Sequence, residues 1–547
     1  CLTITKYAND KRKRLSQDKR GDLSLKYPVS RCKLATKSFV DDDFPAEYKS
    51  MYYSPEDHKN DKRQWLRLCD VKLYGRQNNS PWVLFRYPLK PTDVLQGVVE
   101  KALENQMWVP LIEKAVAKLY GCYQALAAGQ PYEGLNLLTG VPCTAVSVLL
   151  SDDDRNESNL STIWSKLVEY RNKRYPMLAG CGSNHAEAKE AKEKGLSTIH
   201  CYCVLDVREI RQRRLIKLLD PRGVTDFKGG WTEAYILDLY MQSGLLLNGC
   251  GDLWINLEDF TKYFSAVGVC KIRNKWFEKT VSGKYPTYED QTPSFISFVV
   301  EETTEIEFVL YQKNLRMLPE SERYRMGLFL VILKRNETSS YELFDCTEDR
   351  STNLFICHEK IFGRGKYVAI PLSFYHWHSS HIKEPKYNLA FHSSKKIITR
   401  QMKLSLTLRD ILIPIARKYG ETKDSTPLLR LYYLEKSFLG PLLMVENRHD
   451  KWAHVKLVGK GRCCNVTSSR GNTVDTIDSI PPEHGQIVAI YTQLKYEEPY
   501  SYYPMMYSRI AWCPELLDWG DEENSLNVPK IKKDVDILHQ PFALVES

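Results

Sequence analysis

A histidine and an aspartate in the middle of the chain have the spacing of a catalytic base and the group that orients it. His200 leads the alternating, Val/Leu/Tyr-rich run 201–207, and a second apolar run, 214–219, ends at Asp220. These runs predict two strands, and the charged residues 208–213 predict the turn between them. Because directly opposed residues have Cα atoms roughly 5 Å apart, His200 would lie opposite Asp220 at one end of a sheet. An imidazole held by a carboxylate can take a proton from a nucleophile.

Two other interpretations compete with this chemistry. A lone histidine near a sheet edge is more often a core residue with satisfied hydrogen bonds. A second cluster contains cysteine and histidine side chains, which bind zinc, but it lacks a compact set of four ligands. The alternative to a zinc site is a strand end that carries aromatic and imidazole side chains. The members of that cluster are Cys357, His358, His376, His378 and His381.

The composition predicts a globular protein of several domains. The chain has 547 residues, of which 43% are hydrophobic and 27% charged. No run approaches the ~20 apolar residues of a membrane span, and the basic N-terminal stretch is unlike a signal peptide. The net charge of +9 is spread along the chain without interleaved aromatics, so we expect protein partners and no nucleic acid. Fifteen scattered cysteines indicate reduced thiols and a cytoplasmic location.

Hydrophobic periodicity divides the chain into four parts. We expect a linker over 1–36, a mixed α/β region over 37–275, a β-sandwich over 276–385 and a further β-rich domain over 386–547. Within the mixed region a helical stripe is predicted. It comprises Trp108, Leu111, Ile112, Ala115, Val116 and Leu119.

Four segments in this order resemble the calpain family of papain-like cysteine proteases. They are HCYCVLDVRE, LLDPRG, KGGWTEA and GDLWINLEDFTKYF, and the helix beginning at Trp108 is similar to calpains too. Segments after 388, among them MVENRHDKWAHVKL, are similar to the C-terminal domain of the small-optic-lobes type. The resemblance implies an α+β fold: a papain-like core with a truncated first lobe, then a β-sandwich and a β-rich C-terminal domain.

The resemblance also implies the roles of the site residues. His200 would be the base, Asp220 would take the place of the family's orienting Asn, and Gln96 in VLQGV would help to form the oxyanion hole. The Cys-Trp segment that should follow Gln96 is missing. No cysteine lies between Cys69 and Cys122.

Other cysteines are poor substitutes for the missing nucleophile. A reactive thiolate needs a neighbouring base or cation, and no motif places Cys122, Cys143 or Cys181 beside one. Cys201 and Cys203 point away from the face of Tyr202, and we expect them in the core.

In calpains, loop carboxylates bind calcium. The matching positions are Asp226, Glu233 and Asp252, whereas a fourth is Cys250, whose thiol is a poor calcium ligand. Another matching position in the first lobe is Asn136. Calcium is therefore an open possibility, with ordinary surface acids as the alternative.

Two functions remain. The family implies a cytoplasmic, calcium-dependent cysteine endopeptidase that cleaves proteins at a limited number of sites. The missing nucleophile favours an inactive relative, a pseudoprotease that binds proteins as a regulatory scaffold.

Overall fold

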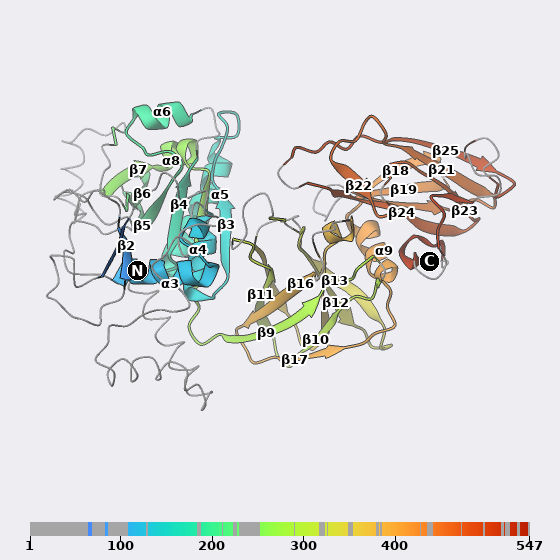
Figure 1. Cartoon of the computed structure of the whole chain (residues 1–547), viewed down its shortest axis with the longest axis horizontal. Helices are drawn as coiled ribbons and strands as arrows, with labels where there is room; N and C mark the ends of the chain where they lie inside the picture. The colour runs from blue at the N-terminus through green and yellow to red at the C-terminus, as the bar shows by residue number, and fades with distance from the viewer. Residues whose placement is uncertain are drawn as a thin grey trace. The chain divides into compact units, whose positions relative to one another are not determined.

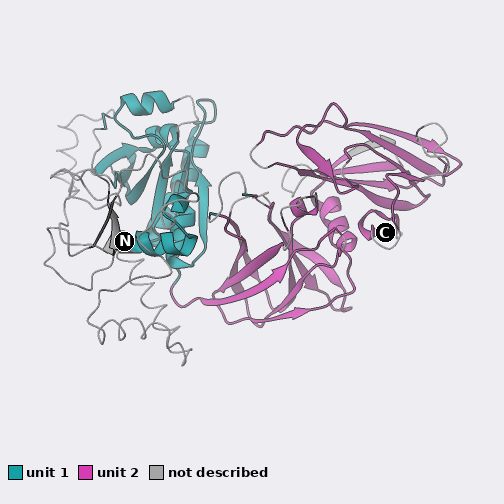
Figure 2. Ribbon diagram, viewed as in Figure 1, with its two compact units in different colours: residues 1–273, 316–323 teal, residues 274–315, 324–547 magenta. Residues whose placement is uncertain are grey.

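The computed structural model describes most of the chain after residue 112. Backbone and side chains are described for 112–126, 129–182, 187–210, 212–221, 227–228, 252–288, 290–316, 323–324, 326–347, 354–377, 382, 385–422, 428–434, 441–471, 473–495, 498–515, 519, 526–532 and 536–544. The backbone alone is described for 64–67, 82–85, 108–111, 378 and 423–426. None of the helices in these ranges is both long and apolar enough to cross a membrane. The chain forms two compact units, residues 1–273 with 316–323 and residues 274–315 with 324–547 (Figure 2).

The first unit is built on a six-stranded sheet in the order β3-β8-β4-β5-β6-β7, with every neighbouring pair antiparallel (Figure 1). The strands are β3 (Cys143–Ser147), β4 (Met177–Cys181), β5 (His200–Ile210), β6 (Arg213–Leu219), β7 (Asp252–Asn256) and β8 (Ala266–Cys270). The helices are α3 (Trp108–Tyr120), α4 (Pro131–Thr139), α5 (Glu157–Asn172), α6 (Ala188–Glu193) and α8 (Leu257–Tyr263).

Helices α5 and α8 cover one face of this sheet. The side chain of Asn156 caps α5 by accepting the backbone N–H of Asn159, and apolar residues then recur at 160, 163, 164 and 167. They share one apolar core with alternate residues of β5 and β6 and with Phe260 of α8. Helix α4 packs on the opposite face. It can approach closely because Gly268 on β8 has no side chain: an added Cβ would lie only 3.3 Å from Cβ of Tyr132.

The predicted hairpin is present, but its strands are longer than expected. β5 reaches Ile210 and β6 begins at Arg213, so the turn is only residues 211–212, with Gln212 at φ 64°. The described charged side chains of the run 208–213, Arg208, Glu209 and Arg213, are exposed or half-buried at the strand ends, where solvent accepts them. The charged run 208–213 therefore belongs mostly to the strands, and predicting the turn from its charge was wrong.

The register also differs from the prediction. Cys203 pairs with Leu219, so Asp220 follows beside Tyr202, two residues beyond His200, and a bulge lies near Leu205. The expected burial of Cys201 and Cys203 was wrong as well. Tyr202 is fully buried in the core, whereas the two cysteines are half-buried on the other face.

Helix α3 forms where its periodicity predicts it, yet it does not bury the predicted stripe. Ile112 is 40% exposed and Leu119 is 61% exposed, and Lys114 and Ala117 face the interior instead. Of the described stripe residues, Ile112, Ala115 and Leu119 are therefore exposed.

The second unit contains two regions, each with two antiparallel sheets. In the first region, here the proximal region, the sheets are β13-β12-β15-β10-β17 and β14-β11-β16-β9. Its strands are β9 (Phe277–Lys284), β10 (Phe295–Val300), β11 (Thr304–Gln312), β12 (Phe329–Arg335), β13 (Tyr341–Cys346), β14 (Phe355–Phe362), β15 (Gly365–Leu372), β16 (Lys386–Ser393) and β17 (Ile398–Met402). Phe298, Phe308 and Phe362 from both sheets meet in one core.

The second region, here the distal region, has the sheets β18-β19-β20-β24-β22 and β25-β21-β23-β26. Its strands are β18 (Glu421–Thr426), β19 (Leu429–Leu434), β20 (Leu442–Asn447), β21 (Trp452–Val458), β22 (Val466–Ser468), β23 (Thr476–Ile480), β24 (His484–Gln493), β25 (Met505–Ala511), β26 (Asn527–Val528) and β27 (Phe542–Ala543). Helix α9 (Leu408–Tyr419), with a Thr407–Asp410 capping box, packs against both regions through one shared core.

The structure moves the boundary between these regions. The sequence placed it at 385/386, but β16 and β17 pair with β9, β11 and β10. The proximal region therefore continues to Met402, because its last two strands complete sheets begun more than 100 residues earlier.

Candidate functional site

The structure brings His200 and Asp220 into contact. His200 begins β5, and its Nε2 lies 2.8 Å from Oδ1 of Asp220. The imidazole is 19% exposed, whereas the carboxylate is fully buried. An ionised carboxylate only accepts hydrogen bonds, so Nε2 carries the hydrogen and, in a neutral ring, Nδ1 is the acceptor. The arrangement can hold an imidazole with one ring nitrogen directed away from its orienting group.

Tyr202 supports this dyad, and sequence reasoning missed it. Its ring meets His200 edge-on with centroids 5.1 Å apart, and Phe264 packs against its other side at 5.5 Å. The Tyr202 hydroxyl accepts the backbone N–H of Ser197 at 2.7 Å. The i,i+2 spacing from His200 was the available signal, since such residues share a strand face.

The thiols nearest the dyad lack the properties of a nucleophile. Cys181 is the Cα partner of His200 across β4 and β5, but it is 1% exposed, and burial raises its pKa to about 11. Burial, with the neighbouring Cys203, raises the pKa of Cys201 to about 12. Both groups are therefore neutral thiols near pH 7, and a thiolate is the reactive form.

Apart from the half-buried Cys203, the other thiols that the structure describes in this unit lie in its interior. Cys122, Cys143 and Cys270 are each at most 3% exposed. A hydrogen bond from Cys143 lowers the pKa of Cys270 against the effect of burial, and Thr139 lies 3.5 Å from its sulfur. However, Cys270 lies next to the first residue of β4, Met177. His200 pairs with Cys181 at the other end of that strand. Cys270 is fully buried and lies away from the imidazole along β4.

The predicted calcium set is described in part. Two of its carboxylates, Asp226 and Glu233, lie outside the described residues. So do Gln96, the predicted oxyanion residue, and the predicted linker over 1–36. Asp252 forms an ion pair with Lys217, with Nζ 2.9 Å from Oδ2 and side chains 11% and 7% exposed. An ammonium thus occupies the place beside this carboxylate that a cation would need. Asn136 is buried and donates to the carbonyl of Val141, which is a structural role. Asp252 and Asn136 thus both have protein partners in this structure, and calcium binding stays a prediction.

His358 and His376, the two histidines of the alternative zinc cluster whose side chains are described, have other partners. His358 pairs with Asp345 at 3.1 Å, and Nε2 of His376 bonds the carbonyl of Pro286 at 2.8 Å. The ring of His378 and all of His381 are outside the described residues. Among the side chains that the structure does describe, no three His, Cys, Asp or Glu residues are grouped to hold a metal.

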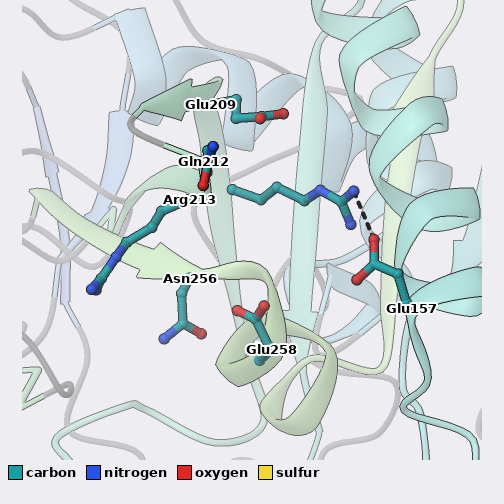
Figure 3. Close-up of a pocket in the computed structure, with 7 residues that line it drawn as sticks. Glu157, Glu209, Gln212, Arg213, Asn256 and Glu258 are labelled. Atoms are coloured by element: carbon teal, nitrogen blue, oxygen red, sulfur yellow. Dashed lines mark ion pairs between the residues drawn. The ribbon is translucent and has the colours of Figure 1, made fainter.

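A polar pocket of about 370 Å³ lies at the other end of the β5–β6 hairpin (Figure 3). Arg214 and Glu157, at its wall, form an ion pair at 2.9 Å. A hydrogen bond from Ser161 and then the Arg214 charge lower the pKa of Glu157. Because β5 spans roughly 30 Å at 3.3 Å per residue, this pocket is separate from the dyad. It is lined by Glu157, Glu209, Gln212, Arg213, Arg214, Asn256 and Glu258.

Comparison with known proteins shows which family these features resemble. Residues 88–271 match the family profile described as "Calpain family cysteine protease", and residues 415–511 match "Calpain-D-like, C-terminal domain". Mouse (Mus musculus) Calpain-5 is 23% identical over 321 residues, which are 50% of this chain and 50% of that protein. Human (Homo sapiens) Calpain-14 is 31% identical over 183 residues, 32% of this chain and 25% of that protein.

A plant protein is also similar to part of this chain at modest identity. The calpain-type cysteine protease DEK1 of Arabidopsis thaliana is 27% identical over 194 residues, 34% of this chain and 9% of that protein. The chain spans about half the length of the Calpain-5 relatives that it matches. The His200–Asp220 dyad lies inside the first matched range, and the chain is similar to the calpain family of cysteine proteases across residues 88–271 and to the calpain-D-like C-terminal domain across residues 415–511.

Proposed function

We propose that this chain is a pseudoprotease that binds extended polypeptide segments beside His200 and does not cleave them. The observation that carries the proposal is the retained His200–Asp220 contact at 2.8 Å in a chain with no cysteine between residues 69 and 122. Proton transfer from a base accelerates peptide cleavage only when it activates a nucleophile. Beside this base, the buried Cys181 and the half-buried Cys201 both have a raised pKa and are therefore protonated near pH 7.

The same proposal covers the finer assignments. We assign the first unit to a papain-like core with a truncated first lobe, and the exposed stripe of α3 supports a missing packing partner. The two-sheet proximal region is the family's β-sandwich, and the calpain-D-like match supports the small-optic-lobes type. A cytoplasmic location is supported by the described cysteines, which form no disulfide with one another. For calcium, we propose that Asp226 and Glu233 carry any binding and that Asp252 contributes none while Lys217 pairs with it.

A peptide-binding measurement tests the proposed function. The full chain is incubated with a positional-scanning library of decapeptides blocked at both ends. Bound peptides are eluted, and mass spectrometry shows whether they are intact or cleaved. We expect intact peptides, with affinity falling roughly 3- to 10-fold in His200→Ala, the size of one net hydrogen bond. His358→Ala is the matched control, because His358 is also half-buried and paired with an aspartate, in the other unit. Cleaved peptides, or binding that His200→Ala leaves unchanged, would refute the proposal.

An active endopeptidase is the second candidate, and the family match over 88–271 favours it. It requires a form of the transcript in which a Cys-Trp segment follows Gln96 before Glu100. Sequencing full-length cDNA across residues 96–108 decides this. A transcript population without such a segment removes the candidate.

A further inference from the structure

The residue before the histidine has an unusual backbone conformation. Ile199 has φ 53°, in the left-handed region. That region is a steric outlier for a β-branched side chain, because its Cβ approaches the backbone closely. Among the described residues, seven other than glycine have positive φ, and six of them carry polar or charged side chains. Ile199 is the apolar exception.

The surrounding structure holds this conformation from both sides. Two residues earlier, the Ser197 amide is fixed to the hydroxyl of the fully buried Tyr202. One residue later, His200 is fixed by pairing with Cys181 on β4 and by its bond to Asp220. The chain must turn between these anchors, which explains the positive φ. The turn does not explain the isoleucine, since glycine or asparagine adopts it at lower cost.

Burial does not explain the isoleucine either. Ile199 is 81% exposed, the highest fraction among the large hydrophobic side chains described. A strained backbone and an uncovered aliphatic side chain both cost free energy, and no burial against the described residues offsets them. Strain of this kind is concentrated at ligand-binding positions, where a bound partner can supply the missing contact.

The geometry points to Ile199 as the specificity-determining residue of the His200 site, one that selects polypeptide segments with a large aliphatic or aromatic side chain next to the imidazole. This inference rests on the proposed function. The exposed aliphatic side chain of Ile199 and the partly exposed imidazole of His200 belong to consecutive residues. In a neutral His200 ring, Nδ1 accepts an N–H, and in an extended peptide a backbone N–H lies beside each side chain. The two groups therefore suit one residue of a bound peptide.

Four variants test the inference in the full chain with the decapeptide library. Ile199→Asn and Ile199→Gly remove the apolar group but accept positive φ, whereas Ile199→Val keeps a β-branched apolar group. Leu205→Asn is the matched control, since Leu205 is 49% exposed on the same strand and roughly 20 Å away. We expect one library position to prefer large apolar residues in the wild type. The preference is lost and affinity falls roughly tenfold in Ile199→Asn and Ile199→Gly, with little change in Ile199→Val and Leu205→Asn.

Thermal melting separates recognition from folding. Because Asn and Gly relieve the strain, both variants melt at or above the wild-type temperature while they lose the preference. A preference that persists in Ile199→Asn overturns the inference and leaves the proposed function standing. Melting below the wild type in both variants shows that the isoleucine serves the fold, which also overturns it. A library in which no peptide binds in a His200-dependent way overturns the proposed function, and the role of Ile199 with it.

Discussion

Acidification should destabilise the distal region through one buried histidine. His539 lies in the short 3₁₀ helix η8 (Ile537–His539), is 1% exposed, and its Nδ1 lies 2.8 Å from the carbonyl of Ile487 on β24. A carbonyl only accepts, so Nδ1 carries the hydrogen. Burial, together with the nearby charge of Arg470, lowers the His539 pKa from 6.5 to about 3. The folded protein therefore keeps this ring neutral across the acid range in which the unfolded chain protonates it.

The sign and size of the effect follow from linkage. A folded-state pKa below the unfolded value contributes stability that is fully present above pH 6.5 and is lost as pH falls toward 3. Between pH 7 and pH 5 the loss is about 2 kcal/mol, from ~1.4 kcal/mol per pH unit below 6.5. Neighbouring arginines lower the pKa of Glu446 although burial raises it. Protonation of this carboxylate therefore also reduces the stability, but only below the ordinary carboxylate range near pH 4.

Hydrogen exchange of the β24 amides, corrected for the intrinsic rate at each pH, measures this stability locally. His539→Gln is the comparison, because its side chain does not titrate. We expect the opening free energy of β24 to fall by about 2 kcal/mol more in the wild type than in His539→Gln between pH 7 and pH 5. Equal falls in the two proteins would refute the reasoning, since another group would then carry the pH dependence.

Three further predictions concern the core, calcium and solubility. Arg470 and Asp478 form an ion pair at 2.8 Å with side chains 3% and 0% exposed, so Arg470→Met should cost about 3–5 kcal/mol in urea unfolding and Arg470→Met with Asp478→Leu distinctly less. If the double variant is no more stable than the single one, the buried charge is not the cause. Lys217→Met should let calcium raise the melting temperature more than it does in the wild type, because the ammonium beside Asp252 is gone; equal shifts would contradict this. Leu119→Glu should reduce light scattering at high protein concentration by covering the exposed stripe of α3 with charge, whereas Leu205→Glu should change it less. Unchanged scattering in Leu119→Glu would show that the stripe does not drive association.

Local sequence patterns predicted the elements of the site better than their registration. Alternation after His200 correctly indicated a strand, and the second run indicated its partner. The run 208–213 misled, since charge marks a solvent-exposed strand end as readily as a turn. The two-residue turn and the bulge near Leu205 shifted the register, and neither has a local signature in these residues. His200 still reaches Asp220 because a diagonal neighbour is within range of a long side chain.

Burial and long-range pairing were the features that local pattern could not fix. Cys201, Tyr202 and Cys203 are all apolar enough for either face of β5, and only the packing of α5 and α8 selects Tyr202 for the core. The end of the proximal region depends on β16 and β17 pairing with strands far back in the chain. Likewise, the pairing of Asp252 with Lys217 joins two strands more than 30 residues apart.

Labelling with an epoxide inhibitor of thiol proteases tests most directly whether the retained imidazole still has a sulfur to activate. The full chain and His200→Ala are treated at neutral pH, digested and mapped by mass spectrometry for adducts on each cysteine. The account predicts that no cysteine carries an adduct that depends on His200. An adduct present in the wild type and lost in His200→Ala would contradict it.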